Sequence, residues 1–338
     1  MEGPPVALLD PWPGTRAMVL DRAVEPVLAA FGEVHAHRGA SGRDEARVDA
    51  LLPRTVLVLG QTHLPAARLA RAPLLEAVVN LAGKWQRFVH QAASRARGIE
   101  VLAIAPAMAP AVAEWVLAAI LDRLRGLGAT DRAMREGREA YGIAGNGEAR
   151  TLCGATVGLV GCADLGRALR PLLAPFRCPV LVADPGLPAG FLAERGCRKV
   201  ELERLLAEAE VIAIRAGPTA ENADFLERAR LEWSRLDVTV VLASRAEVLD
   251  FEALDELAEA GRFRLALDLF PEQPVPADAN VRGADRVLLS THRAGGGAAS
   301  YAHLRPLLAE DLGQIHAGSP PLRLQRAESA LACRTRSR

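Results

Sequence analysis

The stretch T-V-G-L-V-G-C-A-D-L-G, residues 156–166, decides the fold of this chain. A short apolar run ends at Gly161, and a helix-like run, R-A-L-R-P-L-L-A-P-F, follows Gly166. The next apolar run, 179–183, ends at Asp184. A strand, a tight glycine turn and a helix point the helix N-terminus at a pyrophosphate, and an acid about twenty residues past the turn binds the ribose 2′-hydroxyl. The sequence therefore predicts a dinucleotide-binding unit of the Rossmann type.

The turn departs from the usual G-x-G-x-x-G motif at its middle position. Ala163 stands where the second glycine of that motif lets the backbone approach the phosphates, and an ordinary glycine turn in an α/β sheet is the alternative explanation. Asp184 supports dinucleotide binding, and it favours NAD over NADP because a 2′-phosphate would meet a carboxylate. The predicted cofactor turn comprises Gly161, Ala163, Asp164, Leu165 and Gly166.

The composition bounds the class of protein. The chain has 338 residues, half of them hydrophobic, which is enough for about two domains with cores of their own. Its 41 basic residues balance its 41 acidic ones, so neither nucleic acid nor an anionic membrane is an expected partner. Five cysteines without metal-ligand spacing or a C-x-x-C pair predict a reduced, cytoplasmic protein with no bound metal. We expect no signal peptide, and no uninterrupted apolar run reaches the ~20 residues of a membrane span.

Strand-like and helix-like runs alternate along the chain, which predicts parallel sheets covered by helices on both faces. The first unit has no glycine-rich phosphate turn, which favours a flavodoxin-like domain. Its strands are expected at 6–10, 34–37, 55–60, 76–81 and 99–104, and its helices at 23–31 and 64–70.

A long helix over 111–125 leads into the second unit, followed by a polar helix over 131–139 and a loop over 142–147. A last helix, 300–316, crosses back to the first domain. Further strands are expected at 211–214, 238–242, 265–267 and 287–289, and further helices at 201–208, 221–230 and 251–260. We therefore expect a first domain of 1–110 completed by 297–338, with a Rossmann domain of 111–296 inserted in it.

Eight stretches follow one another along the chain in an order that can be compared with known families. They are N-L-A-G-K at 80–84, V-A-E-W-V-L at 112–117, L-C-G-A-T-V-G-L-V-G at 152–161, L-E-R-L-L-A-E-A-E-V-I at 202–212, G-P-T-A-E-N at 217–222, V-L-A-S-R-A-E-V-L-D-F-E-A-L at 241–254, L-D-L-F-P-E-Q-P-V-P at 267–276 and V-L-L-S-T-H-R-A-G-G at 287–296. Their order resembles the D-isomer-specific 2-hydroxyacid dehydrogenase family. The resemblance implies an NAD-dependent oxidoreductase that interconverts a small 2-hydroxy acid and its 2-keto acid, and a homodimer formed through the helix after Val112.

The resemblance assigns two catalytic side chains. Arg245, five residues before Asp250, matches the family's arginine, whose planar guanidinium holds the substrate carboxylate and carbonyl. His292 matches the general acid/base, which takes the hydroxyl proton as hydride leaves and returns it in reduction. The alternatives are a surface arginine after a strand and a loop histidine bonded to backbone.

The third catalytic position departs from the family, which places a glutamate there to orient the histidine and stabilise its protonated form. Gln273 occupies this place in the run L-D-L-F-P-E-Q-P. An amide can still orient an imidazole by a hydrogen bond, but it adds no negative charge. Glu272 could substitute for the glutamate only if the loop were shifted.

The remaining predicted site residues follow from the same resemblance. The backbone N–H groups of Gly83 and Lys84 are expected to receive the substrate carboxylate, although Lys84 is equally explained as an exposed loop residue. Asp268 resembles the acid near the nicotinamide amide, with an ordinary strand-end residue as the alternative. Because Ala163 and Gln273 both depart from the family pattern, a non-catalytic NAD(H)-binding regulator or degenerate paralogue is the competing function.

Overall fold

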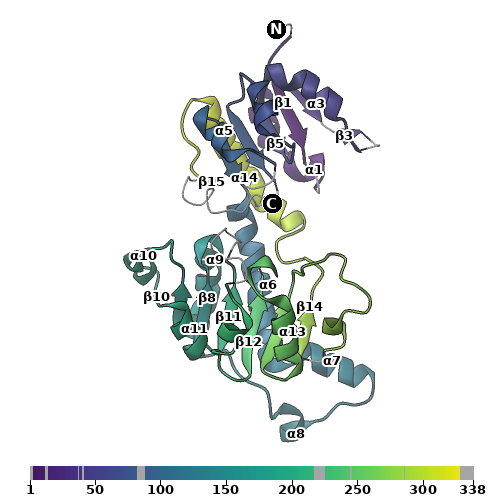
Figure 1. The fold of residues 1–338 in the computed structure, drawn as a ribbon, viewed down its shortest axis with the longest axis vertical. Coiled ribbons are helices and arrows are strands. Elements are labelled where there is room, and N and C mark those ends of the chain that lie inside the picture. Colours follow the sequence, from purple (N-terminus) through teal and green to yellow (C-terminus); the bar gives the residue numbers. More distant parts are fainter. Residues whose placement is uncertain are drawn as a thin grey trace. The chain divides into compact units, whose positions relative to one another are not determined.

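The computed structural model describes residues 3–11, 14–36, 38–39, 42–81, 88–216, 225–243, 246–284 and 286–327. The chain forms two compact units (Figure 1). Unit 1 comprises Met1–Ala109 and Gly296–Arg338, and unit 2 comprises Pro110–Gly295. These bounds differ by one residue from the expected division, and the second unit is inserted in the first.

Unit 1 is built on a six-stranded sheet in the order β15-β7-β6-β5-β1-β2. All its strands are parallel except β15, which pairs antiparallel with β7. The strands are β1 (Val6–Asp10), β2 (Glu33–Ala36), β5 (Thr55–Gly60), β6 (Ala77–Asn80), β7 (Glu100–Ala103) and β15 (Gln325–Arg326), and β3 (Arg38–Gly39) forms a separate ribbon with β4 (Gly42–Arg43). With β1 between β2 and β5, the parallel strands have the flavodoxin-like order, as predicted.

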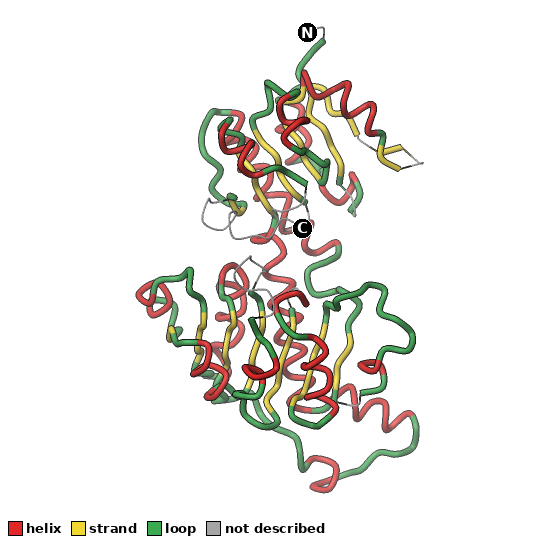
Figure 2. Tube along the Cα trace, in the orientation of Figure 1, coloured by secondary structure: helices red, strands yellow, loops and turns green. Residues whose placement is uncertain are grey.

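Apolar side chains of β1 alternate between the two faces of this sheet. Ala7 and Leu9 pack in the core that contains Leu304 and Leu308 of α14, whereas Leu8 packs in the core that contains residues of α3 and α4. Both faces are therefore covered, as the buried strands predicted (Figure 2). The helices of unit 1 are α1 (Arg16–Val19), α2 (Val24–Ala30), α3 (Glu45–Leu51), α4 (Ala66–Ala70), α5 (Gln91–Ala96) and α14 (Ala298–His316).

Unit 2 is built on a seven-stranded parallel sheet in the order β10-β9-β8-β11-β12-β13-β14. The strands are β8 (Val157–Val160), β9 (Val180–Ala183), β10 (Arg198–Lys199), β11 (Val211–Ile214), β12 (Val238–Leu242), β13 (Phe263–Leu267) and β14 (Val287–Leu289). The chain starts at β8, adds strands on one side and then continues from β11 on the other. Ligands of such sheets bind outside the carboxyl ends of the strands at this switch point.

Helices cover both faces of the second sheet. The core on one face contains Val116 of α6 and Leu169 of α9, and the core on the other contains Leu205 of α11 and Leu254 of α13. The helices are α6 (Ala105–Arg125), α7 (Leu127–Arg135), α8 (Gly142–Asn146), α9 (Ala163–Leu173), α10 (Ala189–Ala193), α11 (Leu202–Glu208), α12 (Arg228–Leu231) and α13 (Phe251–Glu259), with 3₁₀ turns at Leu52–Arg54, Ala174–Phe176, Ala246–Val248 and Asn280–Arg282.

Helix α6 is longer than expected, because it begins six residues before 111 and contains Pro110. Its 21 residues, with a mean hydropathy of 1.3 over an 18-residue stretch, are enough for a membrane span by length and composition alone, which the shorter expected range was not. Val116 and Ile120 on this helix are buried in the core of unit 2. A core helix has the same composition, so the apolar character of α6 is explained by packing.

Four local expectations were wrong, one of them the polar helix over 131–139, which the structure places at Leu127–Arg135. Residues 142–147 were expected to be a loop but contain the short helix α8, closed by a 2.8 Å hydrogen bond from Asn146 Nδ2 to the Gly142 carbonyl. Of the helix expected over 221–230, only Arg228–Leu231 is helical in the described part, because Leu226 pairs with Leu249 instead. Helix α9 begins at Ala163, inside the turn.

Candidate cofactor and catalytic site

Candidate residues follow the strands of unit 2 at their carboxyl ends. Gly161 follows β8, Asp184 follows β9, Arg215 follows β11 and Asp268 follows β13. Because the strands are parallel, these ends lie along one edge of the sheet. The candidate residues therefore gather at the edge where a switch point places a ligand.

The turn after β8 brings the backbone close to the neighbouring strand connection. Gly161 has a φ of 78°, and its N–H donates to the Ala183 carbonyl at 2.9 Å. A Cβ at this position would lie 2.9 Å from the Ala216 nitrogen, so only glycine fits. The N-cap residue of α9, Cys162, makes no side-chain capping bond, which leaves the first N–H groups of the helix suited to an anion.

The Asp184 side chain connects the end of β9 to this turn by hydrogen bonds. Its Oδ2 accepts from the N–H of Cys162 and its Oδ1 accepts from the N–H of Gly186, each at 2.9 Å. Since each carboxylate oxygen can accept two hydrogen bonds, these contacts leave acceptor capacity for ribose hydroxyls. The ribose-binding role of Asp184 stays a prediction, and the structure adds a role in shaping the turn.

The other residues of the turn have different surroundings. Asp164, in the first turn of α9, forms an ion pair with Arg167 at 3.3 Å. Leu165 is buried in the core, so only its backbone can face a cofactor. Gly166 packs against the sulfur of Cys162, and burial raises the pKa of the Cys162 thiol to about 12. The first turn of α9 thus combines one acid with a thiol that stays protonated at neutral pH.

His292 and Gln273 contact each other as predicted. The Nδ1 atom of His292 lies 3.0 Å from Oε1 of Gln273, whose Nε2 in turn lies 3.5 Å from the Phe270 carbonyl. Since an amide oxygen only accepts, this contact assigns the proton to Nδ1 and makes Nε2 the basic nitrogen. His292 has a φ of 58°, a conformation that non-glycine residues seldom adopt.

Asp268 holds the loop that carries His292. Its fully buried carboxylate accepts from the Ser290 hydroxyl at 2.6 Å and from the N–H groups of Arg293 and Ala294 at 2.7 and 2.9 Å. Its backbone carbonyl accepts from the N–H of His292 at 3.1 Å. These contacts surround His292 on both sides along the chain, so they fix its backbone conformation. The sequence assigned Asp268 to the cofactor and did not reveal this role.

Three predicted site residues, Gly83, Lys84 and Arg245, lie outside the described residues. In the sequence, Arg245 falls between the end of β12 and the 3₁₀ turn Ala246–Val248, in the connection that leaves the candidate edge. Its pairing with a substrate carboxylate stays a prediction, as does the substrate loop at Gly83 and Lys84.

Unit 1 carries a second polar group of residues that sequence reasoning missed. Buried polar side chains cluster at the carboxyl ends of β1, β5 and β6, where the apolar strand patterns end. They are Asp10, Gln61, Thr62 and Asn80. Polar residues at the carboxyl edge of a flavodoxin-like sheet are typical of a ligand site, and the abrupt change from apolar to polar was the available signal.

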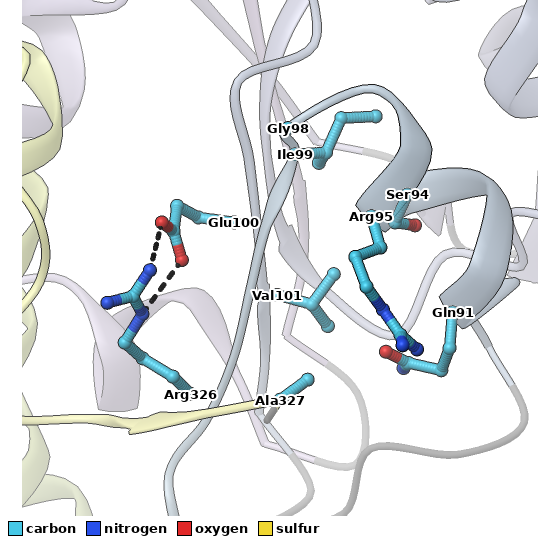
Figure 3. Close-up of a pocket in the computed structure, with 9 residues that line it drawn as sticks. All are labelled: Gln91, Ser94, Arg95, Gly98, Ile99, Glu100, Val101, Arg326 and Ala327. Atoms are coloured by element: carbon cyan, nitrogen blue, oxygen red, sulfur yellow. Dashed lines mark hydrogen bonds and ion pairs between the residues drawn. The ribbon is translucent and has the colours of Figure 1, made fainter. Parts of the chain in front are cut away.

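A cavity of about 280 Å³ in unit 1 is lined by none of these candidate residues. It is lined by α5, β7 and the end of β15 in unit 1, beside the 2.5 Å ion pair between Glu100 and Arg326 (Figure 3). A second cavity of about 230 Å³ lies behind the glycine turn, between α9 and α10. The candidate site is therefore defined by its residues, which line neither of these two cavities except for the turn residues Cys162 and Gly166.

Unit 2 is thus a dinucleotide-binding domain of the Rossmann type with a histidine and an amide side chain at its ligand-binding edge. A family model described as the NAD-binding domain of D-isomer specific 2-hydroxyacid dehydrogenases matches residues 117–294, just over half of the chain. The chain belongs to the D-isomer specific 2-hydroxyacid dehydrogenase family, as the sequence predicted.

Individual relatives agree with this assignment. A D-3-phosphoglycerate dehydrogenase of Mycobacterium bovis is 29% identical over 260 residues, which are 76% of this chain and 48% of that protein. A glyoxylate reductase of Korarchaeum cryptofilum is 26% identical over 76% of this chain and 78% of its own. A phosphoglycerate oxidoreductase structure from Rhizobium etli has 32% identity and a TM-score of 0.79, covering 96% of this chain and 98% of that one. The chain spans about half the length of the phosphoglycerate dehydrogenases that it matches.

The contact between His292 and Gln273 predicts a specific pH effect. A Gln273→Glu variant places a carboxylate beside the imidazole, so the protonated form of His292 persists to higher pH. In an enzyme that reduces a keto acid with these residues, we expect the pH profile of kcat/KM to move up by about one pH unit. A Gln273→Met variant should lower the rate without that upward shift. An unchanged profile in an active Gln273→Glu enzyme would contradict the assigned contact.

Proposed function

We propose that this protein is an NAD-dependent oxidoreductase that interconverts a small 2-hydroxy acid and its 2-keto acid. The observation that carries this proposal is the His292–Gln273 pair, held at the ligand-binding edge of the NAD-binding domain. The turn after β8 suits the cofactor, because Gly161 lets the backbone approach and the N-cap residue of α9, Cys162, makes no side-chain capping bond. When bound, the cofactor supplies or accepts the hydride.

The residues of this chain then have distinct roles. In reduction, Nε2 of protonated His292 donates its proton to the carbonyl oxygen of the keto acid, and in oxidation the neutral imidazole takes the hydroxyl proton. Gln273 orients the ring through Nδ1. Arg245 is the proposed anchor of the substrate carboxylate, and Asp184 is the proposed partner of the adenosine ribose.

A substrate panel tests the proposal. Purified protein is incubated with NADH or NADPH and with glyoxylate, hydroxypyruvate and longer 2-keto acids, and the loss of reduced-cofactor absorbance is followed. We expect turnover with at least one small 2-keto acid and a preference for NADH, since Asp184 would repel a 2′-phosphate. Absence of turnover across the panel, despite NADH binding in calorimetry, would contradict the proposed enzyme.

The same experiment separates the second candidate function, a non-catalytic NAD(H)-binding regulator. Ala163 in the turn and Gln273 at the acidic position favour it, because both depart from the family pattern. A regulator binds NADH without turnover, and its cellular role survives an Arg245→Ala, His292→Ala double variant. We also propose a homodimer through α6, and light scattering measures the molar mass that distinguishes a dimer from a monomer.

A further inference from the structure

Arg215 lies beside the glycine turn, immediately after β11. Its N–H donates to the Val160 carbonyl at 2.8 Å, so it is tied to the residue that precedes the turn. Gly161 approaches it so closely that a Cβ there would lie 3.1 Å from the carbonyl carbon of Arg215. The side chain of Arg215 therefore starts at the switch point, next to the start of α9.

Arg215 is half-buried as a residue, but its Nε atom is buried, and little in the described chain compensates its charge. Its Nε is buried and has no hydrogen-bond partner among the described residues. Burial lowers the pKa of Arg215, and Asp164 is the neighbouring charge that opposes this effect. Asp164 also pairs with Arg167. A cation with a buried Nε that shares the one counter-charge found for it among the described residues is unfavourable unless another anion binds it.

A buried Nε alone does not mark a site, because Arg262 also has one. The guanidinium of Arg262, however, donates through another nitrogen to the backbone carbonyls of Ser234, at 2.9 Å, and Glu232. The difference at Arg215 is its position, beside the N-terminus of an 11-residue helix whose N-cap residue makes no side-chain capping bond. Helix N–H groups and a planar guanidinium are both suited to phosphate oxygens.

We infer that Arg215 binds the pyrophosphate of the dinucleotide and offsets the charge of Asp164 in the turn. This inference rests on the proposed function, since it names the residue that holds the phosphates of the same cofactor. Asp164 places a carboxylate beside two phosphate charges, which repel it. Arg215 and Asp164 therefore have opposite effects on cofactor affinity, whereas partners in a purely structural ion pair would have the same effect.

Calorimetric titration of variants tests the sign and size of these effects. We expect Arg215→Gln to weaken binding of NADH and of ADP by about 10- to 100-fold, because one charge-assisted contact is lost. Adenosine, which lacks phosphate, should bind within about twofold of its wild-type affinity. Asp164→Asn should tighten NADH binding by about threefold or more, because it removes a like charge.

Arg167→Gln is the matched control, since Arg167 contacts the same acid but its side chain is 64% exposed. It should change NADH affinity by less than about threefold. Arg215→Lys keeps the charge without the planar fork, so partial recovery of ADP binding is expected if Arg215→Gln folds poorly. The thermal midpoint of each variant is measured alongside to report folding.

The outcomes are distinct. Unchanged ADP affinity in folded Arg215→Gln overturns the inference, as does a loss of affinity in Asp164→Asn equal to that in Arg215→Gln. Arg215-dependent ADP binding without keto-acid reduction leaves the inference standing and overturns the proposed function. Keto-acid reduction with normal cofactor affinity in Arg215→Gln overturns the inference alone.

Discussion

His292→Ala is expected to lower kcat for keto-acid reduction by about 10²- to 10⁴-fold, the usual contribution of a positioned general acid/base. The imidazole is held by Gln273 at 3.0 Å and by its own backbone, so the alanine variant removes the proposed proton donor from that position. Stopped-flow measurement of NADH oxidation separates the chemical step from product release.

The expected loss should appear in kcat and leave the cofactor affinity nearly unchanged, because the proposed role of His292 is proton transfer to the substrate. His303→Ala is the control, since His303 is an exposed histidine of α14 in unit 1. It should retain wild-type activity. A His292→Ala enzyme within about threefold of the wild-type rate would show that another group donates the proton.

Much of the fold was predictable from local patterns. The strands at Thr55–Gly60, Val211–Ile214, Val238–Leu242 and Val287–Leu289 have the expected bounds, because buried parallel strands are continuous apolar runs with sharp polar ends. The bounds of helices were predicted less accurately, since α6 and α9 both begin several residues before the expected positions. Helix starts depend on backbone capping, and α9 lacks a capping side chain that would mark its start.

The candidate site was predictable where a chemically reactive side chain lies in the sequence shortly after a strand. The pairing of His292 with Gln273 was expected from two separate stretches of sequence, and the structure brings them together. The interactions of Asp268 with residues 290–294 and the burial of the Arg215 Nε were not, since both arise from tertiary contacts between strand ends. A residue type after a strand indicates an edge position, but not the partner that it meets there.

The second large effect is expected at Asp268, which acts on His292 through the loop. Asp268→Ala removes the acceptor of two backbone N–H groups and the Ser290 hydroxyl, and we expect unfolding to become easier by about 2–4 kcal/mol. We also expect kcat to fall by about 100-fold or more, because a displaced His292 is out of line with the substrate. Steady-state kinetics and thermal unfolding measure the two effects.

Two milder variants separate loop positioning from lost folding. Ser290→Ala removes one of the three donors and should reduce kcat by less than about fivefold. Asp268→Asn keeps an oxygen that accepts from the N–H of Arg293. Its NH2 group then faces the N–H of Ala294, and two donors cannot bond each other. We therefore expect an intermediate loss of kcat. Across these variants, we expect the loss of kcat to follow the number of loop hydrogen bonds removed more closely than the thermal midpoint does.

Ligand binding by Asp268→Asn then decides between the loop role and the cofactor role. If Asp268 positions His292, the variant binds NADH and ADP-ribose with nearly wild-type affinity while kcat falls. If the carboxylate instead holds the nicotinamide amide, NADH binding weakens by about tenfold or more while ADP-ribose, which lacks that ring, binds normally. The burial of Asp268 and its three bonds to the His292 loop favour the first result, because the second needs the same oxygens to face the cofactor.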